Sequence, residues 1–336
     1  MKISASIFSN KDRPLEDLVR ELEECGVDLA HIDCNDNLGV EDAIARIRAV
    51  SSLPIDLHII SDDPAKFYPM IARQRVDYVT FQHENLQGRI PEFPDLGCQY
   101  GLAITTGTPN AVFDQYAAHC DFILFMTTTP GQSGGTFDAA NFRKIRDFRR
   151  AYPGKRIHVD GGVNAEVSFV LRNLGVYSAV SGNFLVNAGN LPRAFLQLLV
   201  QKKHVNHLHV RDMMLQRDEL PVLRQSELSL PALLRKIEDV QMGYCLLTDD
   251  QDQLTGLVTN ADLRRGLLRH FDQLGALDAQ EMVNPNPKTI ADTATIDELL
   301  AAVRSFPFIV QFLPVVDASH RLVGAVNFNN LILGEL

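Results

Sequence analysis

The sequence has no long hydrophobic run and a deficit of positive charge. No apolar stretch among its 336 residues approaches the roughly 20 that a membrane-spanning helix needs, so we expect no transmembrane segment. The N-terminus, M-K-I-S-A-S, has no long apolar stretch and no cleavage-site pattern, so we expect no signal peptide. The net charge of −10 at pH 7 argues against general nucleic-acid binding, because a phosphate backbone would be repelled.

Cysteine is scarce and dispersed. An odd set without any C-x-x-C pair is typical of free thiols in a reducing compartment, so we expect a cytoplasmic protein. The hydrophobic content of 46% predicts a globular chain with ample core, and 336 residues favour two domains. The five cysteines are Cys25, Cys34, Cys98, Cys120 and Cys245.

Short apolar runs alternate with amphipathic stretches over the first 200 residues. This alternation is typical of β-α-β units with a parallel sheet, and eight such units predict a (β/α)8 TIM barrel, an α/β fold. The segment Asn85–Cys98 contains Pro91 and Pro94, so we expect only a short helix there. The eight expected strands are Lys2–Ser6, Leu29–Asp33, Pro54–Ile60, Tyr78–Phe81, Tyr100–Ile104, Phe122–Met126, Arg156–Asp160 and Tyr177–Ser181.

Histidines and aspartates stand at the ends of three of these strands. His31 and Asp33 are two apart and share one side of their strand, His58 lies on the next strand, and Asp160 ends the seventh. A lone histidine at a strand end is usually structural, but four such residues on one barrel edge form a ligand set for Zn²⁺, Fe²⁺ or Mn²⁺. Two carboxylates on opposite faces of an enediolate could invert a stereocentre by moving one proton each.

Residues 1–203 resemble the ribulose-phosphate 3-epimerase family. The resemblance implies that His31, Asp33, His58 and Asp160 are the metal ligands and that Asp33 and Asp160 are the acid–base pair. It also implies that Ser6 contacts the substrate and that Met126 shields the intermediate. The motifs that carry it are S-I-F-S at Ser6–Ser9, H-I-D-C-N-D at His31–Asp36, D-L-H at Asp56–His58, G-L-A-I-T-T-G-T-P at Gly101–Pro109, M-T-T-T-P-G at Met126–Gly131 and V-D-G-G-V-N at Val159–Asn164.

Phosphate recognition also follows from the resemblance, since the family binds phosphate with backbone N–H groups of three loops. Glycine turns beside a helix start suit an anion, and barrels often hold phosphate after their last strands. Few basic side chains stand nearby in the sequence, so we expect no lysine or arginine clamp. The expected residues are Gly131, Gly134, Gly135, Gly161, Gly162, Gly182 and Asn183.

The chain departs from the family pattern around the expected pocket. Asn35 and Ile60 replace methionines, Gln82 stands where the family has a histidine, and Gly135 replaces a glutamine. These changes retain the reaction class and leave the substrate open. The default is epimerisation of D-ribulose 5-phosphate to D-xylulose 5-phosphate at C3, and another phosphorylated ketose is the alternative.

Residues 204–336 contain an internal repeat, Val210–Leu268 and Met282–Leu333, and resemble a tandem CBS-domain pair (Bateman module). The motif G-L-V-T-N-A-D implies that Thr259 and Asp262 bind an adenine or other nucleotide. The second copy has Asn327 and Asn330 at these positions, so we expect at most one good site. A pure dimerisation module is the alternative. We expect the domains to span 205–272 and 276–336.

Three functions are therefore open. The first is a metal-dependent sugar-phosphate epimerase (EC 5.1.3 type) of carbohydrate metabolism, a homo-oligomer that a nucleotide or metabolite effector regulates through the CBS pair. The second is a sugar-phosphate or nucleotide sensor that has lost turnover. The third is an isomerase that acts on another ketose phosphate.

Overall fold

The computed structural model describes residues 1–128, 135–199, 208–307 and 310–328. The chain divides into two compact units, Met1–Lys203 and His204–Asn329. Each unit has its own sheet system.

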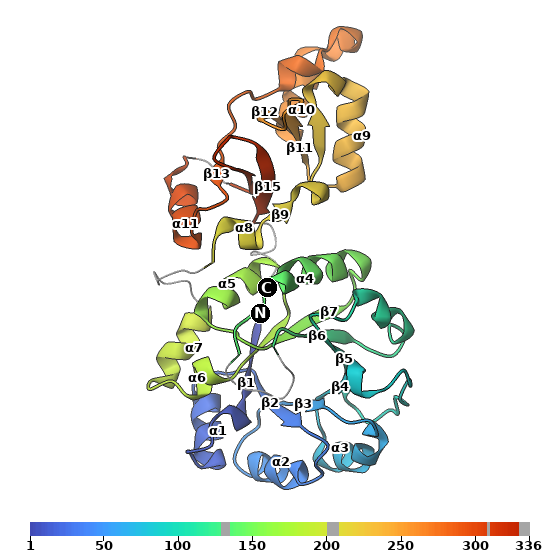
Figure 1. Cartoon of the computed structure of the whole chain (residues 1–336), viewed down its shortest axis with the longest axis vertical. Coiled ribbons are helices and arrows are strands. Elements are labelled where there is room, and N and C mark those ends of the chain that lie inside the picture. The colour runs from blue at the N-terminus through green and yellow to red at the C-terminus, as the bar shows by residue number, and fades with distance from the viewer. Residues whose placement is uncertain (129–134, 200–207, 308–309, 329–336) are drawn as a thin grey trace. The chain divides into compact units, whose positions relative to one another are not determined.

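The N-terminal unit is a closed barrel of eight parallel strands, in which each strand pairs with the next and β8 pairs with β1 (Figure 1). The predicted barrel is confirmed, and every predicted strand is present with ends that shift by at most one residue. Most strands are buried along their length, as a parallel sheet covered on both faces requires. The strands are β1 (Lys2–Ser6), β2 (Leu29–Cys34), β3 (Ile55–Ile59), β4 (Tyr78–Gln82), β5 (Gln99–Thr105), β6 (Phe122–Met126), β7 (Arg156–Asp160) and β8 (Ser178–Ser181).

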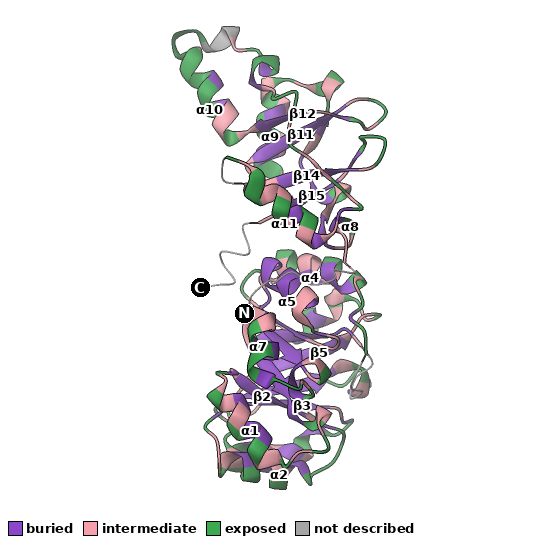
Figure 2. Ribbon diagram, turned by 90° about the vertical axis from the view of Figure 1, so that its left-hand side faces the viewer, coloured by how far each residue is buried: buried purple, intermediate pink, exposed green. Residues whose placement is uncertain are grey.

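Amphipathic helices surround this barrel (Figure 1), and their buried residues lie toward the strands while their exposed residues lie outward (Figure 2). In α1, for example, Leu18, Val19 and Leu22 are buried, and they recur at the three- and four-residue spacing of one helical face. Asn164 begins α5 by accepting hydrogen bonds from the backbone N–H groups of Glu166 and Val167. The helices are α1 (Leu15–Glu24), α2 (Val40–Arg48), α3 (Tyr68–Gln74), α4 (Ala140–Ala151), α5 (Ala165–Asn173), α6 (Asn183–Val186) and α7 (Leu191–Leu199).

The expected helix between the fourth and fifth strands does not form. A 3-10 helix, η3 (His83–Asn85), follows β4, and residues 86–98 contain no helix. Pro91 and Pro94 lack the backbone N–H that a helix interior requires, which explains the extended path. A second 3-10 helix, η4 (Asn110–Gln115), replaces the α-helix of the next connection.

The barrel interior changes from apolar to polar along the strands. At the amino-terminal ends Leu29, Tyr78 and Phe122 pack together and close that end of the barrel. At the carboxyl ends the buried side chains include His31 and His58, which are polar. Because a barrel core is filled by layers of side chains, this polar layer is the part of the interior available for chemistry.

The C-terminal unit contains two copies of one strand–helix–strand–strand arrangement. In each copy the first two strands are parallel and the last two antiparallel, with a register shift at the end of the central strand. The first copy contains β10 (Val222–Arg224), α9 (Leu230–Val240), β11 (Tyr244–Thr248), β12 (Leu254–Thr259) and α10 (Asn260–Arg269). The second contains β13 (Ile290–Ala291), α11 (Ile296–Ser305), β14 (Phe312–Val316) and β15 (Leu322–Asn327). The first copy is preceded in the chain by α8 (Val210–Met213) and β9 (Leu215–Gln216).

Central strand β11 is buried on both faces, which joins the two copies. Cys245 and Leu247 pack on α9, whereas Tyr244 and Leu246 pack toward residues of β14 and β15. The Tyr244 ring stacks on Phe312 with centroids 3.8 Å apart. The unit is completed by β9, which pairs with β15. The remaining short 3-10 helices are η1 (Ile7–Ser9), η2 (Pro64–Phe67), η5 (Arg217–Glu219), η6 (Gln225–Glu227), η7 (Phe271–Ala276) and η8 (Ala279–Met282).

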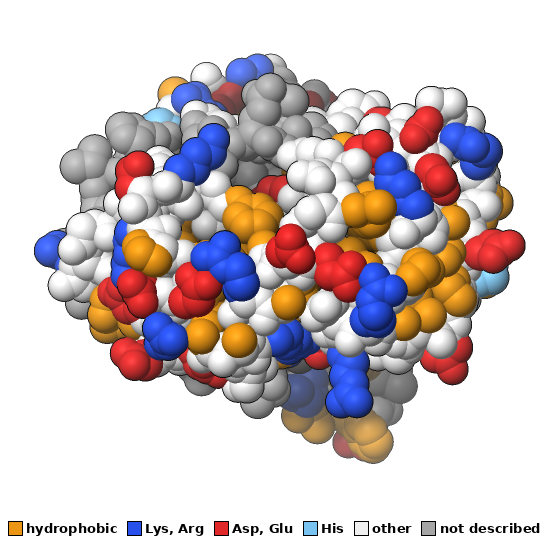
Figure 3. All heavy atoms as spheres, turned by 90° about the horizontal axis from the view of Figure 1, so that it is seen from below, with side chains coloured by type: hydrophobic (Ala, Val, Ile, Leu, Met, Phe, Trp, Pro, Cys, Tyr) orange, Lys and Arg blue, Asp and Glu red, His pale blue; other side chains and the backbone are white. Residues whose placement is uncertain are grey.

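Acidic and basic side chains lie next to one another among hydrophobic ones on the described part of the face in Figure 3. Ion pairs of the same kind join neighbouring barrel helices, as Arg46–Glu16 joins α2 to α1. Within the described ranges no helix has both the length and the apolar character to cross a bilayer. All five cysteines lie in the described part of the chain and are free thiols.

Candidate active site

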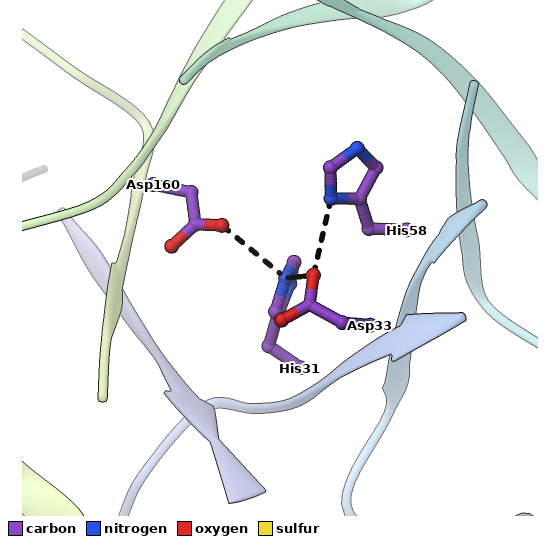
Figure 4. A group of neighbouring side chains, drawn as sticks. All are labelled: His31, Asp33, His58 and Asp160. Carbon is purple, nitrogen blue, oxygen red and sulfur yellow. Dashed lines mark hydrogen bonds and ion pairs between the residues drawn. The ribbon is translucent and has the colours of Figure 1, made fainter. Parts of the chain in front are cut away.

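Four side chains converge at the carboxyl ends of the barrel strands (Figure 4). His31 and Asp33 come from β2, His58 from β3 and Asp160 from β7, and the β2–β3 register places Asp33 beside His58. One potential ligand atom from each of these residues lies within 4.8 Å of all the others. The structure thus brings together the four residues that the sequence singled out as ligands.

The spacing of these atoms fits a single divalent ion. Asp33 Oδ1 lies 3.2 Å from His58 Nδ1 and 3.4 Å from His31 Nε2, and Asp160 Oδ2 lies 3.6 Å from His31 Nε2. Ligands at about 2.1 Å in a tetrahedron are about 3.4 Å from one another, which is the same separation. His31 Nε2 is buried without a hydrogen-bond partner, as expected of a nitrogen whose partner is a cation.

The two histidines and the two carboxylates differ in exposure. The histidine side chains have no exposed surface, whereas Asp33 and Asp160 expose 22% and 15% of theirs. The carboxylates are therefore the members of the set that a molecule entering the barrel mouth can reach. Proton transfer to or from such a molecule requires this access.

The charges of the four residues are strongly coupled. Burial raises the pKa of Asp33, but interactions with the neighbouring His31 and His58 imidazoles outweigh this and bring the pKa well below its usual value. Burial lowers the pKa of His31, but Asp56 and Asp33 outweigh it and bring the pKa well above the usual value. Burial raises the pKa of Asp160 to about 6, although His31 partly offsets the rise. Perturbation of this kind is concentrated at functional sites.

A carboxylate behind the site orients His31, and the sequence reasoning gave it no role. Asp56 Oδ2 lies 3.0 Å from His31 Nδ1 and accepts a hydrogen bond from Ser4 Oγ at 3.0 Å. Asp56 is fully buried, and this contact leaves the other ring nitrogen of His31 to face the site. Asp56 precedes His58 by two residues on one strand, so the two-residue period was a signal that could have found it.

Gln82 is the second residue whose role the sequence did not reveal. It lies at the end of β4, and its Oε1 is 2.8 Å from His58 Nε2. Sequence comparison with the family pattern marked it only as a departure. The contact makes it a partner of a candidate ligand.

The expected substrate-contact residues lie around the same mouth. Ser6 ends β1, with its Oγ 3.0 Å from Ser9 Oγ, and Met126 is buried at the end of β6. A side chain at Gly161 or Gly162, both at positive φ, would meet the backbone of Thr128 or Phe137 within 3.0 Å. Gly135 is similarly close to Thr128, and Gly131 and Gly134 lie outside the described residues.

Two basic side chains lie closer to the expected phosphate loops than the sequence indicated. Lys11 and Arg13 line a hollow of about 530 Å³ together with Asn183. They belong to the loop after β1, which is distant in sequence from β8 and adjacent to it in the closed barrel. The guanidinium of Arg13 forms an ion pair with the carboxylate of Glu21, with an N–O distance of 2.5 Å. The sequence predicted few basic side chains near these loops, and Lys11 is one that it did not single out.

A cavity of about 780 Å³ lies within the C-terminal unit and includes Thr259 and Asp262 in its lining. Thr259 begins α10, and the side chains of Thr259 and Asp262 each accept a hydrogen bond from the backbone N–H of the other. Arg265 and Lys288 also line the cavity, so it carries both signs of charge. Asn327 ends β15, and Asn330 lies outside the described residues.

A parallel (β/α)8 barrel whose titratable side chains converge at the carboxyl strand ends has the architecture of a barrel enzyme. The profile of the ribulose-phosphate 3 epimerase family matches residues 2–186, which is more than half of the 336 residues. The chain therefore belongs to the ribulose-phosphate 3 epimerase family. The CBS domain profile matches residues 279–333.

Individual relatives match each unit. The ribulose-phosphate 3-epimerase of Bacillus subtilis is 27% identical over 212 residues, which cover 59% of this chain and 98% of that protein. The ribulose-phosphate 3-epimerase of Methanocaldococcus jannaschii is 29% identical over 182 residues, or 50% of this chain and 76% of that protein. A crystal structure of CBSX2 in complex with AMP covers 38% of this chain and 95% of that chain, with 23% identity and a TM-score of 0.32.

Proposed function

We propose that the barrel is an active, metal-dependent sugar-phosphate epimerase whose default reaction interconverts D-ribulose 5-phosphate and D-xylulose 5-phosphate. The observation that carries this proposal is the four-residue site, in which the spacing fits one ion and the two carboxylates are the exposed members. His31, Asp33, His58 and Asp160 would hold Zn²⁺, Fe²⁺ or Mn²⁺. When bound, the ion would supply electrostatic stabilisation for negative charge on the substrate oxygens.

The chain's own carboxylates would move the protons. Asp33 and Asp160 come from β2 and β7, so they approach the centre of the barrel from different sides (Figure 4). One carboxylate takes the proton from C3 on one face of the ketose, and the other delivers a proton to the opposite face of the enediolate. The configuration at C3 is inverted, and each carboxylate ends in the protonation state that the other began with. Reverse transfers through solvent restore the starting state.

The substrate phosphate would lie on the glycine loops that follow β6, β7 and β8. Gly161 and Gly162 have no room for side chains, and Gly182 lies against Ser9, so backbone N–H groups can approach an anion closely. Ser6 would contact the sugar, and Met126 would keep water from the intermediate. Gly131, Gly134, Gly135 and Asn183 complete the proposed phosphate site.

The C-terminal pair, with proposed boundaries 205–272 and 276–336, would bind an adenine or other nucleotide as an effector. Thr259 and Asp262 share the lining of the 780 Å³ cavity with Arg265 and Lys288. A carboxylate suits ribose hydroxyls and the basic side chains suit phosphate, which favours a nucleotide over an apolar ligand. Homo-oligomerisation and a cytoplasmic location, for which the free cysteines are suited, complete the proposal.

The alternative of a sensor without turnover is less favoured by the contacts of Gln82. Because Gln82 replaces a histidine of the family pattern, it favoured a site that has lost catalysis. Its hydrogen bond to His58 gives it instead a function in support of a ligand.

Metal content and its dependence on single histidines test the proposal. The full-length protein, purified without chelator, is expected to contain about one divalent ion per chain by elemental analysis. His31→Ala and His58→Ala are expected to lose the ion, whereas His119→Ala, an exposed histidine stacked on Phe93, retains it. A wild-type protein that takes up no Zn²⁺, Mn²⁺ or Fe²⁺ would contradict the proposal.

A further inference from the structure

We propose that Gln82, held in one orientation by Glu84, is a positioning residue that fixes the tautomer of His58 and thereby the affinity of the site for its ion. This inference rests on the proposed function, because it assigns His58 to a metal site. It concerns residues outside the proposed ligand set.

The tautomer of His58 decides whether it can be a ligand at all. Its side chain is fully buried, with Nδ1 3.2 Å from Asp33 Oδ1 and Nε2 2.8 Å from Gln82 Oε1. A neutral imidazole has one N–H donor and one acceptor nitrogen. If the proton is on Nε2, Nδ1 presents a lone pair to the site. If the proton is on Nδ1, that nitrogen cannot bind a cation.

The amide of Gln82 selects between these two states. With Oε1 toward His58, the amide accepts a hydrogen bond and the proton of the imidazole is on Nε2. With Nε2 toward His58, the amide would donate and the imidazole proton would move to Nδ1. Gln82 is 1% exposed, so water cannot replace Gln82 or His58 in the hydrogen bond between them. Asp33 Oδ1 also faces Nδ1, but with an ion bound by both Asp33 and Nδ1 no proton would remain between them. In the ion-loaded site the orientation of one amide would thus control the coordinating nitrogen.

Glu84 allows only one of the two amide orientations. Gln82 Nε2 donates a hydrogen bond to Glu84 Oε2, and an ionised carboxylate can only accept. Rotation of the amide by half a turn would place Gln82 Oε1 against that carboxylate, so that two acceptor oxygens would repel each other. The oxygen of Gln82 must therefore face His58.

Glu84 is itself held as an acceptor from the next strand. Its Oε1 accepts hydrogen bonds from Thr105 N and Thr105 Oγ1, both at 2.9 Å, and from Thr108 Oγ1. Partial burial raises the pKa of Glu84, but these bonds and the one from Gln82 outweigh it and keep the pKa below its usual value. Hydrogen bonds therefore run from the end of β5 through Glu84 and Gln82 to His58 on β3.

The alternative is that Gln82 and Glu84 only fill space in the fold. Substitutions that keep the side-chain shape and change its hydrogen bonds distinguish packing from positioning. Gln82→Met keeps the length of the side chain and removes both hydrogen bonds. Glu84→Gln keeps the shape and leaves the orientation of the Gln82 amide unspecified. Thr108→Val removes one donor to Glu84 and is expected to have the smallest effect.

The experiment measures Zn²⁺ affinity of the full-length protein by dialysis against graded chelator and elemental analysis. Glu84→Gln and Gln82→Met are expected to weaken binding by about 10- to 100-fold, the range found when a partner of a metal-bound histidine is lost. Asp28→Asn is the matched control, because Asp28 accepts a hydrogen bond from Ile3 N at the amino-terminal end of the strands. It is expected to bind Zn²⁺ as the wild type does.

A second readout reports the tautomer directly. Nitrogen NMR of the Zn²⁺-loaded, histidine-labelled protein is expected to show His58 protonated at Nε2, and Glu84→Gln is expected to weaken that signal. Affinities of Glu84→Gln and Gln82→Met within twofold of the wild type would overturn the inference. If Gln82→Met does not fold, Glu84→Gln, at the rim of the barrel, decides the matter. Failure of the wild type to bind Zn²⁺ would instead refute the proposed function.

Discussion

Asp262→Ala tests the assignment of the C-terminal cavity to a nucleotide. In the free protein the substitution removes hydrogen bonds that Asp262 accepts from Thr259 N, at 2.9 Å, and from Thr259 Oγ1, at 2.5 Å. Loss of such a cap costs about 1 kcal/mol, which lowers the melting temperature of a domain of this size by about 4 °C. This decrease is expected with or without nucleotide.

The effect of the ligand is separate and larger. A nucleotide at 100 times its Kd stabilises the folded state by about 2.7 kcal/mol, or about 10 °C. Calorimetry of the full-length protein with AMP and with ATP is expected to show such an increase for the wild type and none for Asp262→Ala.

A matched control is available in the second copy. Glu298 accepts the same two hydrogen bonds from Thr295 at the start of α11 and does not line the cavity. Glu298→Ala is expected to lose helix capping and to keep the full nucleotide effect. Retention of that effect in Asp262→Ala, or its equal loss in Glu298→Ala, would show that the cavity is misassigned.

Three further predictions concern the barrel. Asp33→Asn and Asp160→Asn are each expected to abolish epimerisation and to leave one-sided exchange of the substrate C–H proton wherever the ion is still bound, which deuterium incorporation measures; full turnover by either would contradict the assignment. Gly182→Ala would place a Cβ 2.5 Å from Ser9 Oγ, so steady-state kinetics should show a raised KM at unchanged metal content, and an unchanged KM would remove Gly182 from the phosphate site. Gly101→Ala would place a Cβ 2.2 Å from the Phe122 ring, and urea unfolding should show a free energy of unfolding lower by about 1–3 kcal/mol. An unchanged free energy of unfolding would show that the core accommodates the added methyl group without strain.

The sequence predicted the barrel and the four converging residues for physical reasons. Parallel strands that are buried on both faces have sequences of short apolar runs. Their carboxyl ends lie at one end of the barrel, and this does not depend on the helices between them. The two-residue period placed His31 and Asp33 on the same side of β2. These are local properties of the chain, so a single sequence contains them.

Gln82 and Glu84, which lie behind the candidate ligand His58, could not be predicted in the same way. The contact of Gln82 with His58 depends on the register between β3 and β4, and that of Glu84 with Thr105 depends on the position of η3 beside the end of β5. Lys11 reaches the surroundings of Asn183 only because the barrel closes between β8 and β1. Such contacts depend on the whole fold, and no motif or spacing expresses them.

Proton NMR of D-ribulose 5-phosphate with the full-length protein in D₂O tests the central claim most directly. We expect conversion to D-xylulose 5-phosphate with deuterium at C3, loss of conversion after chelation, and recovery with Zn²⁺, Mn²⁺ or Fe²⁺. A protein that contains its ion and yet leaves the C3 hydrogen of this ketose, and of other phosphorylated pentuloses and hexuloses, unexchanged would contradict it.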